Sequence, residues 1–235
     1  ALTSVSRCIW CNSCTFILIS IRCGGAAQLG RRTRRCQSAA RVQLSQARWV
    51  IAQLTNAPML RCSMLLQCAL VHAVAALHPN GVKIFYDPRH ATHSNAKGHP
   101  ETPRRVDDCR RALERTDATW QYLKQARTDA EDSVRRVHSN EHISRVKRAS
   151  KFYRMGRTRL AVDTYAKRGS HQTMLRAQSL WLDAVDHAST TELAVALSRP
   201  PGHHASRHVA DGFCLYNFAA GAASYALDVL GKDWV

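Results

Sequence analysis

Acidic residues and lysine are missing from the first third of this chain. Residues 1–80 contain nine arginines but no Asp, Glu or Lys, whereas residues 81–235 hold 25 basic and 17 acidic side chains. The formal net charge of +17 for the whole chain therefore falls to +8 in the larger part. A positive charge that is spread over several expected helices, without a nucleic-acid reader motif, does not indicate a nucleic-acid-binding protein. No direct nucleic-acid binding is expected.

The frequency of cysteine changes at the same boundary. Seven of the nine lie before residue 80, and only Cys109 and Cys214 follow it. We therefore divide the chain into an Arg- and Cys-rich leader, residues 1–80, and a folded part, residues 81–235. An acid-free cationic leader is typical of an organelle transit peptide. A disordered or untranslated leader is the alternative.

Long apolar runs are also missing. A membrane-spanning helix needs about 20 predominantly apolar residues, and the run over residues 64–77 is shorter and is interrupted by Gln67 and His72. No membrane span is expected. From Met59, however, a short basic start, this apolar run and the small-x-small triplet at residues 73–75 fit a secretory signal peptide. Localisation stays open between a secretory or organelle route, if the leader is translated, and the nucleus or cytoplasm, if it is not.

Strand and helix signals alternate along the folded part. Residues 82–87 (VKIFYD) and 192–198 (ELAVALS) are short and mostly apolar, which is typical of strands buried on both faces. Helices are expected after Pro103, where apolar residues recur at helical spacing, and over residues 170–188 and 215–230. This alternation predicts an α/β domain with a largely parallel sheet.

Two other stretches have weaker signals. Residues 133–152 are expected to form a short extended piece and then a helix, which Ser139 or Asn140 caps. The segment between the first strand and Pro103 is polar and is expected to be a loop. Four histidines are expected to be loop or structural residues: His90, His93, His99 and His138.

Two adjacent histidines follow the second predicted strand, within RPPGHHASRHVADGFC, residues 199–214. Ligands of parallel sheets bind beyond the carboxyl ends of strands, and a Pro-Pro-Gly turn there would hold His203 and His204 stiffly toward a pocket. One imidazole could act as a general base on water while its cationic neighbour stabilises an oxyanion. Gly212 and Phe213 would add a flat aromatic wall to a narrow apolar channel. The alternative is a pair of solvated loop histidines, since the chain has 12 histidines.

Several motifs, in order, resemble the zinc-dependent histone deacetylase superfamily, which includes acetoin-utilisation proteins and acetylpolyamine amidohydrolases. They are FYDPRHATHSNAKGHPETPRRV, VHSNEHISRVK, VDTYAKRGSHQTMLRA and RPPGHHA followed by DGFCLYNFAAGAASYAL. The resemblance runs from about residue 82 to residue 235. It implies a three-layer α/β domain with a mostly parallel sheet, similar to the arginases.

The implied chemistry is hydrolysis of an acetyl amide, typically that of acetyl-lysine, in which Zn2+ polarises the carbonyl for attack by a bound water. By motif, His203 resembles the electrostatic partner, and His204 resembles the general base that later protonates the leaving amine. Gly212 and Phe213 resemble residues that line the acetyl-lysine tunnel. Cys214 occupies the neighbouring family position.

The sequence departs from the family in two ways. Phe218 stands where the family has a second Asn after its Gly-Phe-Cys motif. In addition, no Asp-x-His tripeptide, the motif that supplies zinc ligands in the family, occurs in the 235 residues. We therefore expect residues 81–235 to be the N-terminal part of a deacetylase domain, truncated at its C-terminal side and inactive alone. Its Zn2+ ligands are expected beyond Val235, where the full-length form would supply them.

Two other functions stay open at this stage. The chain could be a non-catalytic remnant or a partner-binding fragment of the same family, or its full-length form could act on acetylpolyamines. Histone tails, other acetylated proteins and acetylpolyamines all suit the same chemistry, and the sequence does not choose among them. It does not fix an oligomeric state either.

Overall fold

A computed structural model describes residues 16–19, 82–151, 156–190, 193–233 and 235. Its elements are β1 (Phe16–Ile19), β2 (Lys83–Tyr86), the 3-10 helix η1 (Pro88–Thr92), α3 (Pro103–Leu113), β3 (Thr119–Tyr122), α4 (Ala130–Val137), α5 (Asn140–Lys151), β4 (Thr158–Ala161), β5 (Thr164–Ala166), α6 (Ser170–Thr190), β6 (Ala194–Leu197) and α7 (Phe218–Asp228). The leader over residues 1–80 and its signal-like stretch from Met59 lie outside the described residues, apart from β1. In the described part, no helix combines the length and apolar character that a membrane span requires.

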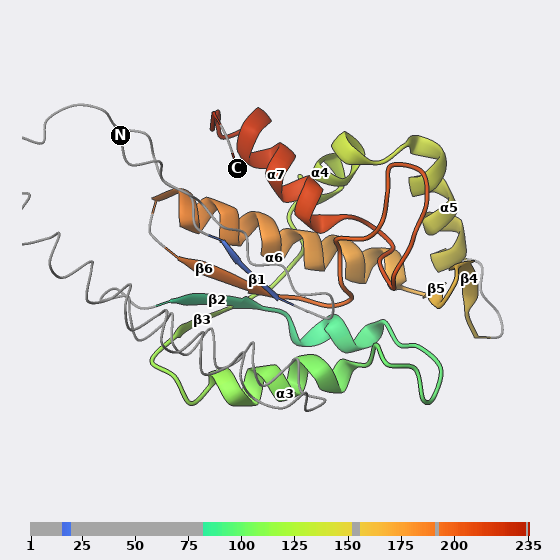
Figure 1. Cartoon of the computed structure of the whole chain (residues 1–235), viewed down its shortest axis with the longest axis horizontal. Helices are drawn as coiled ribbons and strands as arrows, with labels where there is room; N and C mark the ends of the chain where they lie inside the picture. The colour runs from blue at the N-terminus through green and yellow to red at the C-terminus, as the bar shows by residue number, and fades with distance from the viewer. Residues whose placement is uncertain (1–15, 20–81, 152–155, 191–192, 234) are drawn as a thin grey trace, which may run out of the picture.

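The four-stranded sheet has the order β1-β6-β2-β3. Strand β2 runs parallel to both β6 and β3, whereas β1 pairs antiparallel with β6. Helix α3 lies on one side of this sheet and α6 on the other, and α4 and α7 pack farther out against α6 (Figure 1). The predicted α/β fold with a mostly parallel sheet is therefore confirmed.

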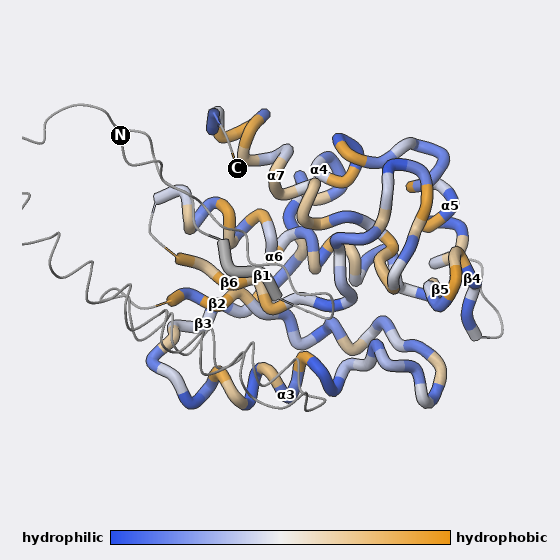
Figure 2. Tube along the Cα trace, viewed as in Figure 1, coloured by the Kyte–Doolittle hydropathy of each residue, from blue (hydrophilic) through white to orange (hydrophobic). Residues whose placement is uncertain are grey.

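The two central strands are buried on both faces, because their alternating side chains feed two cores. Phe85, Ala194 and Ala196 join the core on the α6 side. Ile84 and Val195 point to the opposite core, under α3. Alanines on the α6 side let the long helix pack close to the sheet, and the uninterrupted apolar sequence of β6 is consistent with this double burial (Figure 2).

The prediction for residues 133–152 was wrong in its first part. Residues 130–137 form helix α4 rather than an extended piece, because Ala130, Ser133 and Val134 share one buried helical face. The residue after the helix, His138, has extended backbone. The predicted cap is confirmed, since the Ser139 hydroxyl accepts from His142 N–H at 3.2 Å at the start of α5.

A buried ion pair joins the two segments that follow the central strands. Arg199, two residues after β6, donates from Nε to Glu101 Oε1 at 2.6 Å and from Nη2 to Glu101 Oε2 at 3.0 Å, and both side chains are 0 % exposed. Its Nη1 also donates to the carbonyls of His90 and His93, at 2.9 and 2.5 Å. One guanidinium thus fixes the loop after β2 against the loop after β6.

Removing the charge of Glu101 should test this role. Glu101→Gln leaves the Arg199 guanidinium buried without a counter-charge, and breaking a buried pair in this way costs about 3–5 kcal/mol of unfolding free energy. Chemical denaturation measures the loss. The matched control is Glu114→Gln, which removes the carboxylate of a partly exposed pair with Arg110 and should cost less than about 1 kcal/mol. Equal losses in the two variants would contradict the role of Glu101.

Candidate functional site

The adjacent histidines lie in the loop after β6, at the carboxyl end of the parallel strands. Their ring centroids are 4.0 Å apart with an interplanar angle of 44°. His203 is half-buried and His204 is exposed. Burial, and then the neighbouring His204, lower the pKa of His203 below its ordinary value. The lowered pKa favours the neutral imidazole of His203, and the roles expected for the pair from the sequence stay a prediction.

The backbone of the pair is held by Cys214. Its buried Sγ accepts the N–H groups of both His203 and His204, each at 3.4 Å. Burial raises the pKa of the Cys214 thiol, so it stays protonated and donates to the Gly212 carbonyl at 3.4 Å. The buried Cys214 side chain therefore fixes the backbone of the histidine loop through hydrogen bonds to its sulfur.

Asn217 holds the same loop from the other side. Its Nδ2 donates to the carbonyl of His203 at 3.3 Å and to that of Ala205 at 2.9 Å. Its Oδ1 accepts from Ala220 N–H at 2.9 Å and so caps α7. Sequence reasoning missed this residue as a contributor to the site, although it stands in the Asn position of the family motif.

Two glycines leave room for aromatic rings beside the pair. A Cβ on Gly212, whose φ is +51°, would lie 2.6 Å from His204 Cδ2. A Cβ on Gly202 would lie 2.1 Å from Phe218 Cδ2. Phe218, the residue that departs from the family pattern, is 0 % exposed and belongs to the core. The Phe218 ring packs against the backbone of Gly202, so the Phe that replaces the second Asn of the family motif supports the loop by an apolar contact.

Phe213 forms a wall with residues from two other segments. Its N–H donates to Thr164 Oγ1 at 3.0 Å, and its ring meets the ring of His99 edge-on at 4.9 Å between centroids. The His99 ring is held in turn, because Nε2–H donates to Asp163 O at 3.2 Å and Nδ1 accepts from Glu101 N–H at 3.0 Å. The structure thus brings Phe213 and His99 together at the edge of the site.

Two further histidines, His93 and His138, have structural contacts. His93 is buried, and its Nδ1 lies 2.9 Å from Ser170 Oγ. Burial, followed by the charge of Arg199, lowers its pKa to about 3, so it is neutral. His138 accepts from Asn217 N–H through Nε2 at 2.8 Å. Burial, and then His142, lower the pKa of His138 to about 4.

The Zn2+ that the resemblance implies does not fit the donor set on the described residues. No group of three or more His, Cys, Asp or Glu side chains in that part of the chain is arranged to hold one metal ion, whereas a catalytic zinc takes three protein ligands. The expectation of ligands beyond Val235 stays a prediction.

Comparison with known proteins identifies a matching domain family and several similar proteins. Residues 99–234 match a family model described as a histone deacetylase domain. The uncharacterized protein slr0245 of Synechocystis is 34% identical over 159 residues, which cover 66% of this chain and 51% of that protein. Histone deacetylase 5 of Arabidopsis thaliana is 31% identical over 164 residues, or 66% and 25% of the two chains.

A solved structure is also similar. The crystal structure of the HDA15 HD domain superposes with a TM-score of 0.55 at 28% identity, over 63% of this chain and 43% of that one. The predicted three-layer, arginase/deacetylase-like fold is consistent with this match and is confirmed by it. The chain spans about half the length of the cyanobacterial relative, and less of the plant one.

The contact between Gly212 and His204 can be tested with a matched pair of substitutions. Gly98 and Gly212 both have positive φ, +83° and +51°, but a Cβ on Gly98 meets nothing within 4 Å. Gly98→Ala and Gly212→Ala should each lose about 1–2 kcal/mol of unfolding free energy from backbone strain. Only Gly212→Ala should also shift the His204 ring resonances in a 1H–13C NMR spectrum. Unmoved His204 resonances in Gly212→Ala would refute the contact.

The low pKa of His138 predicts a pH dependence of stability. The unfolded chain protonates this imidazole near pH 6.5 and the folded chain only near pH 4, so its contribution is complete above pH 6.5 and is lost as the pH falls toward 4. Between these two pH values, His138 alone lowers the free energy of unfolding by about 1.4 kcal/mol for each unit by which the pH falls. Chemical denaturation between pH 7 and 5 should show a shallower slope in His138→Gln, which keeps an acceptor, and the wild-type slope in His208→Gln, which alters an exposed histidine. An unchanged slope in His138→Gln would contradict this assignment.

Proposed function

Because this chain belongs to the histone deacetylase domain family, we propose that its protein hydrolyses the acetyl amide of acetyl-lysine in protein substrates. The observation that carries the proposal is the His203–His204 pair. It lies at the carboxyl end of β6, is fixed by Cys214 and is flanked by the Phe213 wall. Such a site offers a positioned imidazole beside an aromatic surface on which an acyl-lysine chain can lie.

We assign the proton transfers to His204. Its exposed ring is accessible to a substrate, and its position is limited by Gly212. As a general base it takes a proton from the attacking water, and as a general acid it returns that proton to the leaving lysine amine. The amide carbon–nitrogen bond breaks, and acetate and a free lysine amine are released.

We assign His203 a positioning and hydrogen-bonding role. Its lowered pKa makes it a neutral imidazole beside His204, where a cation would oppose protonation of the base. A neutral neighbour therefore lets His204 carry the proton during the reaction. The N–H groups of both residues donate to one sulfur, so the main chain of the pair keeps a fixed position.

A non-catalytic role within the family is the second candidate. The observation that favours it is the lack of a three-ligand metal set on the described residues. Under this alternative, the folded part would bind a partner without hydrolysing an amide. Acetylpolyamines are the alternative substrate class for the catalytic function.

The assay that separates these functions follows acetate release from an acetyl-lysine peptide and from an N-acetylpolyamine. It uses the longest natural form of the protein, supplied with Zn2+. We expect turnover of the peptide, and a loss of kcat of about 100-fold or more in His204→Ala, because a general base contributes about 10²–10⁴.

The matched control is His208→Ala, which removes an exposed histidine of the same loop and should keep full activity. Absence of turnover with both substrates would support the non-catalytic role. Turnover of the acetylpolyamine alone would overturn the protein substrate. Full activity of His204→Ala would overturn the assignment of the base.

A further inference from the structure

A cavity of about 680 Å3 lies away from the histidine pair, between α5 and the start of α6. Its volume falls within the range of small-ligand sites, about 300–1,000 Å3. The charged and polar side chains on its lining that matter here are Glu131, Lys147, Lys151, Arg168, His171 and Gln172. They come from three helices and the segment before α6, so several elements of the fold shape this cavity.

The charges on the lining are unequal. Three cationic side chains, Lys147, Lys151 and Arg168, face one carboxylate, Glu131. Lys147 Nζ donates to Glu131 Oε1 at 2.6 Å, and Arg135 pairs with the same carboxylate from outside the cavity. This carboxylate is thus compensated by two cations, and the cavity keeps a net positive charge.

The ionisation of Glu131 is consistent with this balance. Burial acts to raise its pKa, but the hydrogen bonds from Lys147 and Arg135 outweigh burial and hold the pKa below its ordinary value. Glu131 is therefore ionised at pH 7 and keeps Lys147 in place. Arg168 is exposed and makes no hydrogen bond or ion pair with any other described residue, so its guanidinium is available to a ligand.

The start of α6 adds to the positive field. Gly169, with φ +84°, and His171 both line the cavity at the N-terminus of this 21-residue helix. The first turn of a helix presents unpaired N–H groups and the positive end of the helix dipole. Three of these groups already have acceptors, because Gly169 N–H donates to Ser150 O at 3.1 Å, Ser170 N–H to Lys167 O at 2.9 Å and His171 N–H to Ser150 Oγ at 3.0 Å. The helix start therefore contributes its dipole to the cavity rather than a set of free donors. The remaining dipole favours an anion in the cavity.

We propose that this cavity binds the phosphate group of a small organic phosphate. Phosphate carries close to two negative charges at pH 7 and offers three acceptor oxygens, which suit the Arg168 guanidinium and the Lys147 ammonium on the lining. A bare ion would leave most of 680 Å3 unfilled. The space beyond the cations therefore takes the organic part, which can lie against Leu175 and the stem of Gln172 on the same lining.

Isothermal titration of the full chain at constant ionic strength tests the proposal. The probes are inorganic phosphate, hexose 6-phosphate, a phosphoserine peptide and acetate. We expect saturable binding of both inorganic and hexose phosphate, with the hexose phosphate tighter. Arg168→Ala should weaken the binding of both by about tenfold, because a charge-assisted hydrogen bond contributes about 1.5–3 kcal/mol and 1.4 kcal/mol is a factor of ten.

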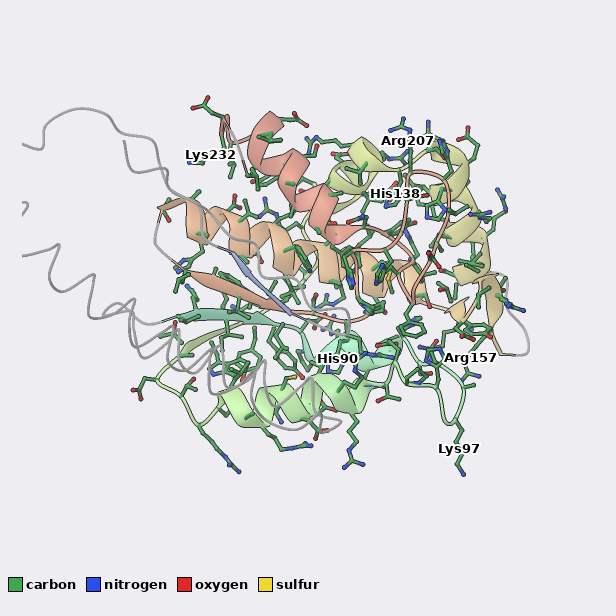
Figure 3. All side chains as sticks on the ribbon, in the orientation of Figure 1. His90, Lys97, His138, Arg157, Arg207 and Lys232 are labelled. Atoms are coloured by element: carbon green, nitrogen blue, oxygen red, sulfur yellow. The ribbon has the colours of Figure 1, made fainter. Side chains whose placement is uncertain are left out.

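The control is Lys97→Ala, which removes one positive charge from a loop side chain that points away from the body of the protein (Figure 3). It should leave each dissociation constant unchanged, and equal thermal melting of the two variants excludes a folding defect at the exposed Arg168. Equal affinity for acetate, or equal weakening by Lys97→Ala and Arg168→Ala, would overturn the proposal. Tighter binding of the phosphoserine peptide than of hexose phosphate would support the phosphate site but replace the small ligand with a phosphorylated protein segment.

Discussion

The buried pair of Arg199 and Glu101 is the interaction on which the rest of the site depends. Residues just beyond two parallel strands must leave the sheet as irregular backbone, and irregular backbone in a buried place needs partners for its carbonyls. Arg199 supplies them to His90 and His93 while Glu101 neutralises its charge. The Arg199 guanidinium therefore provides the hydrogen bonds that a neighbouring strand would provide in a sheet. The histidine loop that follows is consequently fixed at Arg199.

From that fixed point, the histidine loop is held mainly through its own backbone. Cys214 takes two N–H groups, and Asn217 donates to two carbonyls. These hydrogen bonds thus fix the main chain of the pair, which lowers the conformational entropy that the loop would lose on positioning a side chain. Phe218 also fixes the backbone of this loop, because its apolar ring packs against Gly202 without using a hydrogen bond.

The helices and strands that could be predicted from the sequence are those whose buried residues recur in a regular hydrophobic pattern. Strands β2 and β6 were found because both faces are covered, and α6 because its apolar residues recur at helical spacing. Strand β3 was missed, since it is a mostly exposed edge strand of four residues, and α4 was misread because its valines also fit an extended piece. The contact of His204 with Gly212 depends on how two loops approach each other, and no local pattern carries that information.

The anion cavity and the histidine loop share one buried connection. Tyr216, two residues after Cys214, is 0 % exposed, and its hydroxyl lies 3.1 Å from His171 Nδ1. His171 in turn lines the cavity, where its Nε2 lies 3.6 Å from Glu131 Oε2. Tyr216 and His171 therefore connect the lining of the cavity to the segment that follows the histidine loop.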